Sequence, residues 1–406
     1  MNRLPLKAAD GVFNGYLALP PSGRGPGLVL AQEIFGVNAA MRAIADSFAE
    51  EGYVVLVPDL FWRAEPGIEL AYDEAGFARA FALYQAYDEN QGVQDLQVAI
   101  STLRAHPAVT GKVGVMGFCL GGKLAYLCAC RTDADVAIGY YGVGIENALA
   151  EIANRRGRLV LHIAANDAYC PPAAQAQINE ALQGREGVEV YTYPGVDHAF
   201  ARPGGDHYDK TAAQFAHQRS IGALKAVMGP HYDLSALWDQ HCAFEFGTRD
   251  VPATMSTMVA EPYVNHIPTM TGGVGQQALA AFYRDHFVNS NPPDTTLTPI
   301  SRTVGANQVV DELLFCFTHT CEVPWMLPGV APTGKRVEIP LLAVVKFRGD
   351  KLCHEHIYWD QASVLVQIGL LEPKGLPVAG VETARKLVDE TLPSNTLMGA
   401  RAGGSA

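Results

Sequence analysis

The sequence predicts two domains in series, an α/β domain with a mostly parallel β-sheet and then an α+β domain with an antiparallel sheet. Three observations support this prediction. At 406 residues the chain is too long for one ordinary domain. The first half alternates short apolar runs with amphipathic stretches, whereas the second half begins with helical patterns and continues with extended, β-branched segments. The pattern changes after Met228-Gly-Pro230, which places the domains at 1–230 and 231–375 and a C-terminal extension with a disordered end at 376–406.

The first domain alternates strands with helices. It begins with a strand at 27–31, a helix at 38–51 that Gly52 closes, and a strand at 53–57 that a Pro-Asp pair ends. The alternation continues with helices at 94–105, 121–129 and 211–227 and with strands at 112–117, 134–140, 159–164 and 188–193. Strands that are apolar throughout are buried on both faces, so we expect a parallel sheet covered by helices on each side.

The second domain changes from helices to strands. The patterns predict helices at 234–246 and 276–288 and strands at 295–304, 308–319, 337–347 and 351–359. The turn Arg348-Gly-Asp350 joins the last two strands as a hairpin. Helices followed by runs of strands are typical of an α+β domain with an antiparallel sheet.

The net charge and the lengths of the apolar stretches exclude some classes of binding partner. Lys plus Arg number 30 and Asp plus Glu number 42, a formal charge of −12, which argues against a nucleic acid or an anionic membrane. No stretch approaches the roughly 20 apolar residues that cross a bilayer, and residues 1–25 lack the apolar segment of a secretory signal. We therefore expect a cytoplasmic enzyme that acts on a small molecule. The eight cysteines form no Cys-x-x-Cys pair, so most should be plain thiols.

One cysteine lies in a nucleophile elbow. Gly117-Phe-Cys-Leu-Gly-Gly122 follows an expected strand and opens an expected helix, with Cys119 where serine is commoner. Glycines two residues on either side leave room for the strained turn that carries a nucleophile. The following helix N-terminus favours a thiolate. The alternative is a buried cysteine in a glycine-rich turn.

An acid and a histidine follow the elbow in the order that such a fold requires. Asp167 comes after the strand at 159–164, and His198 comes after the strand that ends at Tyr193. Loops at the carboxyl ends of neighbouring parallel strands can bring both to the nucleophile. Asp197 is a rival acid that we assign to the turn, because it adjoins the histidine. His162 lies within a strand and is expected in the core.

Six motifs of the first domain are similar to those of one enzyme family. They are Gln32-Glu-Ile-Phe-Gly-Val-Asn38, Gly52-Tyr-Val54, Pro58-Asp-Leu-Phe61, Gly117-Phe-Cys-Leu-Gly-Gly122, Gly139-Tyr-Tyr-Gly-Val-Gly144 and His198-Ala-Phe-Ala-Arg202. Through them, residues 1 to about 228 resemble the dienelactone hydrolases, also named carboxymethylenebutenolidases. The resemblance implies an α/β-hydrolase fold, hydrolysis of a lactone or ester, and no cofactor.

The resemblance also implies roles for residues that their types alone do not single out. Glu33 would partner the resting thiol of Cys119 and take its proton when substrate binds. The backbone N–H groups of Ile34 and Leu120 would form the oxyanion hole. Arg202 would bind the carboxylate of an acidic lactone. Taken alone, Glu33 would be a helix-start carboxylate and Arg202 a surface charge.

The chain departs from the family pattern at one position. Phe77 stands where the family places a second arginine, and Arg79, two residues on, would point elsewhere on a helix. The carboxylate-binding side of the pocket would then be weaker and the pocket more apolar. We expect its lining to include Phe35, Phe81, Tyr84 and Tyr141, although each could equally be a core aromatic.

The second domain resembles the SnoaL-like family of α+β cone domains over residues 234 to about 370. The similar motifs are Leu237-Trp-Asp-Gln-His241, Asn265-His-Ile-Pro-Thr269, His354-Glu-His-Ile-Tyr-Trp-Asp360 and Gln367-Ile-Gly369. The resemblance implies an apolar cavity with acid and base groups, for which the candidates are His266, Glu312, His356 and Asp360. His319 and Glu355 are further candidates, and alternation along the strand puts Glu355 on the face opposite His356.

Three hypotheses about function remain open. The leading one is a lactone or ester hydrolase with a Cys-His-Asp triad and an acyl-thioester intermediate. In the second, the C-terminal domain is a cyclase, isomerase or dehydratase, and in the third it is an oligomerisation or ligand-capturing module. Histidines near carboxylates also suggest a metal site in this domain, but nothing in the sequence fixes a third ligand, and we expect none.

Overall fold

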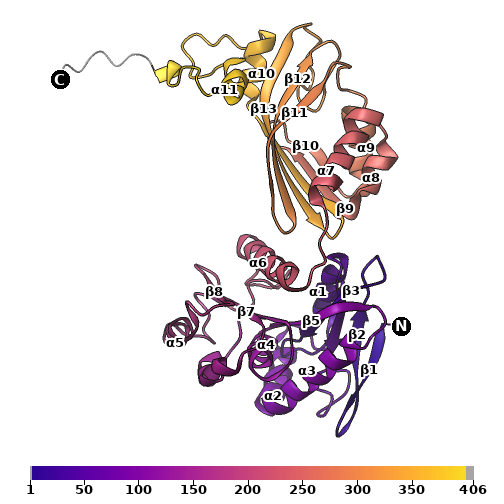
Figure 1. The fold of residues 1–406 in the computed structure, drawn as a ribbon, viewed down its shortest axis with the longest axis vertical. Coiled ribbons are helices and arrows are strands. Elements are labelled where there is room, and N and C mark those ends of the chain that lie inside the picture. The colour runs from indigo at the N-terminus through magenta and orange to yellow at the C-terminus, as the bar shows by residue number, and fades with distance from the viewer. Residues whose placement is uncertain (1, 399–406) are drawn as a thin grey trace, which may run out of the picture. The chain divides into compact units, whose positions relative to one another are not determined.

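The computed structural model describes residues 2–398, so the disorder expected at 399–406 lies outside the described residues. The chain divides into two compact units, Met1–His231 and Tyr232–Ala406 (Figure 1). Each unit has its own sheet and its own hydrophobic core. Within residues 2–398, no helix combines the length and the apolarity that crossing a membrane requires.

The first unit is built on an eight-stranded sheet of order β1-β2-β4-β3-β5-β6-β7-β8. Its strands are β1 (Arg3–Ala8), β2 (Gly11–Ala18), β3 (Gly25–Ala31), β4 (Val54–Pro58), β5 (Val109–Phe118), β6 (Val136–Tyr140), β7 (Arg158–Ala164) and β8 (Val188–Tyr193). β1 and β2 pair antiparallel at one edge, β2 pairs antiparallel with β4, and all later neighbours are parallel. The mostly parallel sheet is therefore confirmed. The edge strands were not predicted, because single residues such as Leu6 and Phe13 face the core in place of a continuous apolar run.

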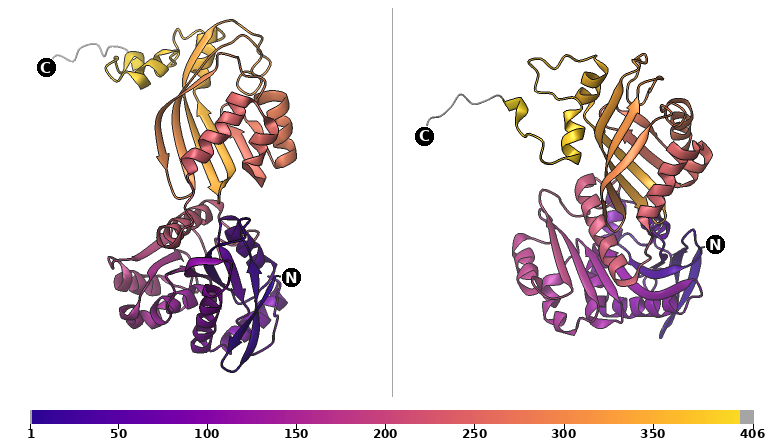
Figure 2. Two further views of the ribbon diagram at one scale, coloured as in Figure 1. Left: turned by 45° about the vertical axis from the view of Figure 1, so that its right-hand side comes forward. Right: turned by 45° about the horizontal axis from the view of Figure 1, so that its top comes forward.

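Helices cover both faces of this sheet (Figures 1 and 2). They are α1 (Ala39–Glu50), α2 (Glu74–Gln85), α3 (Glu89–Arg104), α4 (Leu120–Arg131), η1 (Ile145–Asn154), α5 (Pro172–Leu182) and α6 (Lys210–Met228). In β3, Val29 packs in the core cluster of α3 and α4, whereas Leu28 and Leu30 pack in the cluster of α1 and α6. Both sides of each central strand are therefore buried, as the continuous apolar runs predict.

The second unit has a six-stranded sheet of order β10-β9-β14-β13-β12-β11. Its strands are β9 (Met258–His266), β10 (Thr271–Val274), β11 (Thr296–Val304), β12 (Gln308–Thr318), β13 (Arg336–Arg348) and β14 (Lys351–Trp359). Every pair is antiparallel except β14 with β9. The α+β prediction is confirmed, and β9 and β10 are additions to it.

The helices of the second unit are α7 (Leu234–Cys242), α8 (Val251–Ser256), α9 (Gln276–Phe282), α10 (Gln361–Ile368), α11 (Glu382–Val388) and the 3₁₀ turn η4 (Thr396–Met398). Figure 2 shows the sheet bent, with α7 to α9 against one of its faces. The two helices predicted as uninterrupted each end in a π-helical turn, η2 (Ala243–Thr248) after α7 and η3 (Tyr283–Phe287) after α9.

The segment predicted as an extension begins within this unit. Helix α11 packs against β13, with Ala384 buried. The Ser363 hydroxyl on α10 donates a hydrogen bond of 2.8 Å to the Gly380 carbonyl oxygen. The part of the segment that the structure describes therefore belongs to the fold.

Candidate active site

Cys119 occupies a strained turn between β5 and α4. Its φ is 55°, in the left-handed region that a side chain seldom adopts. The flanking glycines are required by close backbone contact, since a Cβ at Gly117 would lie 2.0 Å from the Gly121 carbonyl oxygen. A Cβ at Gly121 would lie 2.3 Å from the Ala31 carbonyl oxygen. The turn therefore has the geometry of a nucleophile elbow.

Asp167 and His198 meet as the sequence order suggests. Asp167 follows β7, His198 follows β8, and the His198 Nδ1 lies 2.7 Å from the Asp167 carboxylate. The backbone N–H of Tyr169 donates a second hydrogen bond of 2.8 Å to that carboxylate, which is buried. This arrangement fixes the ring with Nε2 directed away from the acid.

Burial alone would lower the pKa of His198, but the charge of Cys119 and the hydrogen bond to Asp167 together raise it to about 10. A negative charge on Cys119 therefore stabilises the imidazolium form of His198. Two aromatic rings hold it edge-on, Tyr141 at 5.0 Å and Tyr169 at 5.1 Å between ring centroids.

Glu33 is held by three groups. Its carboxylate accepts hydrogen bonds from the hydroxyls of Tyr72 at 3.0 Å and Tyr141 at 3.5 Å, and pairs with Arg202 at 3.2 Å. The Arg202 guanidinium also lies 4.0 Å from the centre of the Tyr72 ring. Among the described residues, the buried Nε of Arg202 has no hydrogen-bond partner. The arginine thus keeps a donor in addition to those that face Glu33.

One pocket of about 180 Å³ brings most of the predicted residues together. It is lined by Glu33, Ile34, Phe35, Phe77, Phe81, Tyr84, Cys119, Leu120, Val143, Tyr169, His198, Ala199, Arg202 and His207. In the part of the chain that the structure describes, the N–H groups of Ile34 and Leu120 donate to no backbone carbonyl. Phe77 and Phe81 of this lining stack with their ring centroids 6.2 Å apart, and both remain about two-fifths exposed.

Several residues take positions that the sequence left open. Tyr141 is buried, contacts Glu33 and is not among the residues that line the pocket, where it was predicted. Arg79 forms an exposed ion pair with Glu65, outside the pocket. The Asp197 carboxylate accepts from the backbone N–H of His198, as expected of a turn residue.

His162 is a core residue, as predicted. Its ring nitrogens each lie 2.9 Å from a hydroxyl oxygen, one from Tyr193 and one from Ser220. Burial lowers its pKa to about 3, so the ring stays neutral.

Sequence reasoning missed Tyr72 and His207. Tyr72 precedes the helix cap at Asp73, and His207 lies in the loop before α6, where its Nδ1 donates to the His198 carbonyl oxygen at 3.0 Å. Neither belongs to a motif, and only the fold brings them to the site.

The second unit contains a small cavity of about 30 Å³. Of the four residues proposed for it, only His266 lines it, and burial lowers the pKa of that ring to about 4. Asp360 is exposed and caps α10 by accepting from the N–H of Ala362. Glu312 accepts from the Ser301 hydroxyl on the neighbouring strand, outside the cavity lining.

His356 is the third candidate that does not line the cavity, because strand alternation directs it to the other face of β14. It lies beside His354, with ring centroids 3.9 Å apart, on the face of β14 opposite Glu355. Glu355 is the member of that motif that lines the cavity. His319, the other alternative, is not part of the lining and bonds Thr333.

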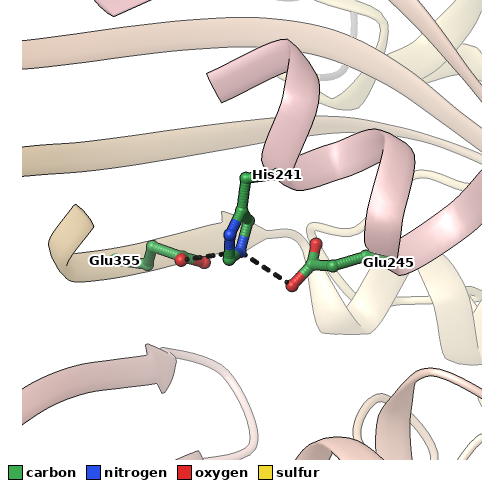
Figure 3. A group of neighbouring side chains, drawn as sticks. All are labelled: His241, Glu245 and Glu355. Carbon is green, nitrogen blue, oxygen red and sulfur yellow. Dashed lines mark hydrogen bonds and ion pairs between the residues drawn. The ribbon is translucent and has the colours of Figure 1, made fainter. Parts of the chain in front are cut away.

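A buried cluster of His241, Glu245 and Glu355 lies at this cavity (Figure 3). Burial alone would lower the pKa of His241, but the two carboxylates raise it to about 10. No sequence argument placed these three side chains together, although His241 and Glu355 lie in motifs that were singled out.

Comparisons with known proteins agree with this division. Residues 13–228 match the model of the dienelactone hydrolase family, and residues 239–355 match a SnoaL-like domain. A carboxymethylenebutenolidase of Pseudomonas putida is 36% identical over 223 residues, which are 54% of this chain and 94% of the relative. A carboxymethylenebutenolidase of Pseudomonas sp. strain P51 is 37% identical over 218 residues, 53% of this chain and 91% of the relative.

One solved structure is a dienelactone hydrolase-like promiscuous phosphotriesterase from metagenomic libraries. It is 20% identical, has a TM-score of 0.49, and the match covers 56% of this chain and 98% of that one.

Proposed function

The chain belongs to the dienelactone hydrolase family and is a hydrolase of lactone or ester bonds, and we propose that Cys119, His198 and Asp167 carry out its reaction. One observation supports this assignment most strongly. Cys119 lies on a strained turn and lines the same pocket as His198. The carboxylate of the buried Asp167 lies 2.7 Å from the His198 Nδ1. A nucleophile, a base and an orienting acid on three separate loops form the working unit of such hydrolases.

The proposed reaction has two halves. The Cys119 thiolate attacks the carbonyl carbon, and the N–H groups of Ile34 and Leu120 bind the oxyanion. The carbon–oxygen bond breaks, the leaving oxygen takes the proton of His198, and an acyl-thioester remains. Neutral His198 then removes a proton from water, and the resulting hydroxide attacks the thioester. Release of the acid restores the thiolate and the imidazolium, and the thiolate then regains from Glu33 the proton that it lost when the substrate bound.

Arg202 and Glu33 form a substrate-sensitive pair in this proposal. Arg202 holds Glu33 at 3.2 Å, and a substrate carboxylate would compete for the same guanidinium. Displaced from Arg202, Glu33 becomes available to accept the proton of the Cys119 thiol, as the family pattern implies. An acidic substrate thus promotes formation of its own nucleophile.

The rest of the pocket is suited to an apolar part of the substrate. Phe35, Phe77, Phe81 and Tyr84 line it, and the position where the family has a second arginine is Phe77. We therefore propose a lactone or activated ester with an apolar body and at most one carboxylate.

Replacement of the nucleophile tests the assignment. In Cys119→Ala we expect turnover of dienelactone and of aryl esters to fall by about 10⁴-fold or more, because the covalent step is lost. Cys130→Ala, on the same helix α4, is the matched control and should retain turnover. If Cys119→Ala keeps the rate of the unmodified chain, the triad assignment is wrong.

A further inference from the structure

Three buried side chains of the second unit point at a common position. His241 lies at the end of α7, Glu245 on the π-turn η2 and Glu355 on β14. The His241 Nε2 lies 3.1 Å from Oε1 of Glu245 and 3.2 Å from Oε1 of Glu355 (Figure 3). The ring is fully buried, and each glutamate is 3% exposed, so water cannot balance their charges freely.

The other ring nitrogen fixes the protonation of His241. Nδ1 lies 2.6 Å from the Thr257 hydroxyl oxygen. That hydroxyl donates its one proton to the Thr254 carbonyl oxygen at 2.6 Å, so it can only accept from the ring. Nδ1 therefore carries a hydrogen, and Nε2 of the neutral ring is a lone-pair donor that faces two carboxylates.

A proton on Nε2 leaves this cluster incompletely satisfied. The single N–H of an imidazolium can point to only one of the two carboxylates. It bonds Glu245, while among the described residues the nearest Glu355 oxygen has an ion-pair contact but no hydrogen bond. A divalent cation with a neutral imidazole and two carboxylates gives a net charge of zero and contacts all three atoms.

A second observation at the same cavity points to a missing ligand. The hydroxyl of Tyr283 is buried beside Glu245 and, within residues 2–398, no contact of this hydroxyl has hydrogen-bond geometry. Tyr283 begins the π-turn η3 and lines the cavity with Glu245 and Glu355. Both π-turns of the unit thus place a polar group at this position, and single π-turns are frequent at functional sites. A metal-bound water would provide the hydroxyl with a partner.

We propose that His241, Glu245 and Glu355 bind one divalent transition-metal ion in the second unit. Two donors at roughly 2.0–2.2 Å from one ion lie roughly 2.8–3.6 Å apart at the usual angles, and the separations of 3.1 and 3.2 Å in this cluster fall in that range. Thr257 orients the histidine, as partners of the outer shell commonly do. Three protein ligands leave a coordination position open, and the cavity that Glu245 and Glu355 line has room for about two solvent molecules.

Binding of Mn²⁺ to the full chain tests the proposal, because the eight thiols would compete for Zn²⁺. Calorimetry should show one ion per chain. Glu355→Gln, which keeps the shape of the side chain, should weaken binding by more than about tenfold, the lower end of the loss seen when only an outer-shell partner is removed. The control is His354→Gln/His356→Gln on the outer face of β14, which should bind as the unmodified chain does.

A spectroscopic measurement keeps the test decisive if Glu355→Gln does not fold. The electron spin echo of Mn²⁺ in the His354→Gln/His356→Gln variant should carry modulation from an imidazole nitrogen. The proposal is overturned if the unmodified chain binds no Mn²⁺, if Glu355→Gln binds it with unchanged affinity, or if the nitrogen modulation is absent. In each of those cases the cluster is a proton-sharing ion-pair network.

Discussion

Each unit pairs a histidine with at least one buried carboxylate, yet the two rings are set up for different chemistry. His198 uses Nδ1 to bind one acid, Asp167, and leaves Nε2 for the nucleophile side of a pocket of about 180 Å³. His241 uses Nδ1 to bind a neutral hydroxyl and turns Nε2 toward two acids beside a cavity of about 30 Å³. Both pKa values are raised to about 10, but by different neighbours.

This difference shows that a raised pKa does not identify the role of a histidine. At His198 the thiolate of Cys119 is the main group that raises the pKa, and it is also the proposed reacting atom. At His241 the groups that raise the pKa are the two other members of the proposed metal site. The role follows from what faces Nε2.

The largest expected effect is on kcat, and it distinguishes Asp167, the partner of His198, from Glu355, the partner of His241. Asp167→Asn should lower kcat for ester hydrolysis by about 10⁴-fold, because an amide disfavours the ring tautomer that the reaction needs. Glu355→Gln should leave kcat unchanged, since it lies in the other unit. Steady-state kinetics on one aryl ester measures both, and equal losses in the two variants would contradict the division of roles.

The titration of His198 should sharpen the comparison. Its pKa is raised to about 10, so the imidazolium persists as pH rises through 6.5 and loses its proton only near pH 10. In Cys119→Ala the pKa should fall, because the thiolate is the strongest of the groups that raise it. Ring carbon NMR shifts followed against pH report this. An unchanged midpoint in the variant would rule out the thiolate as the cause.

Arg202→Gln should lower kcat/KM more for acidic substrates than for neutral ones. A hydrogen bond to a charged group contributes about 1.5–3 kcal/mol, so kcat/KM for a lactone with a carboxylate should fall roughly 10- to 100-fold. A neutral aryl ester should lose much less. Rates on a matched acidic and neutral pair provide the measurement, and equal losses for both would show that Arg202 only supports the fold through Glu33.

The smallest effect should come from removing the second unit. The relatives in Pseudomonas are covered 94% and 91% by this half of the chain alone, so residues 1–231 should fold and keep kcat per site. Light scattering on the same samples reports whether the second unit also holds copies of the chain together. A folded but inactive truncation would show that catalysis needs the second unit.

How much the sequence could predict depends on how local the signal is. The elbow at Cys119 is fixed by neighbours within two residues, and Asp167 and His198 each follow a buried strand, so all three could be found without coordinates. The pairing of Glu33 with Arg202 joins positions 169 apart in the chain, and Tyr72 completes it from a loop without a motif. Only the fold brings these together.

In the second unit the alternating pattern of β14 predicts which residues share a face of the strand, but it does not predict which face points to the core. Alternation put Glu355 and His356 on opposite faces, and the choice depends on the bend of the sheet and on helix α7, which cannot be derived from one strand. The π-turns that place Glu245 and Tyr283 at the cavity were equally hidden, because their sequences have an ordinary helical pattern.

The central claim is that Cys119 forms the covalent intermediate. The most direct test mixes the full chain with an aryl ester whose acyl group leaves the enzyme slowly. The reaction is quenched in acid, and the protein is examined by intact mass and peptide mapping. The account predicts one acyl group per chain, on Cys119, and none in Cys119→Ala. Turnover without an adduct in any quenched sample, or an adduct on another residue that persists in Cys119→Ala, would contradict it.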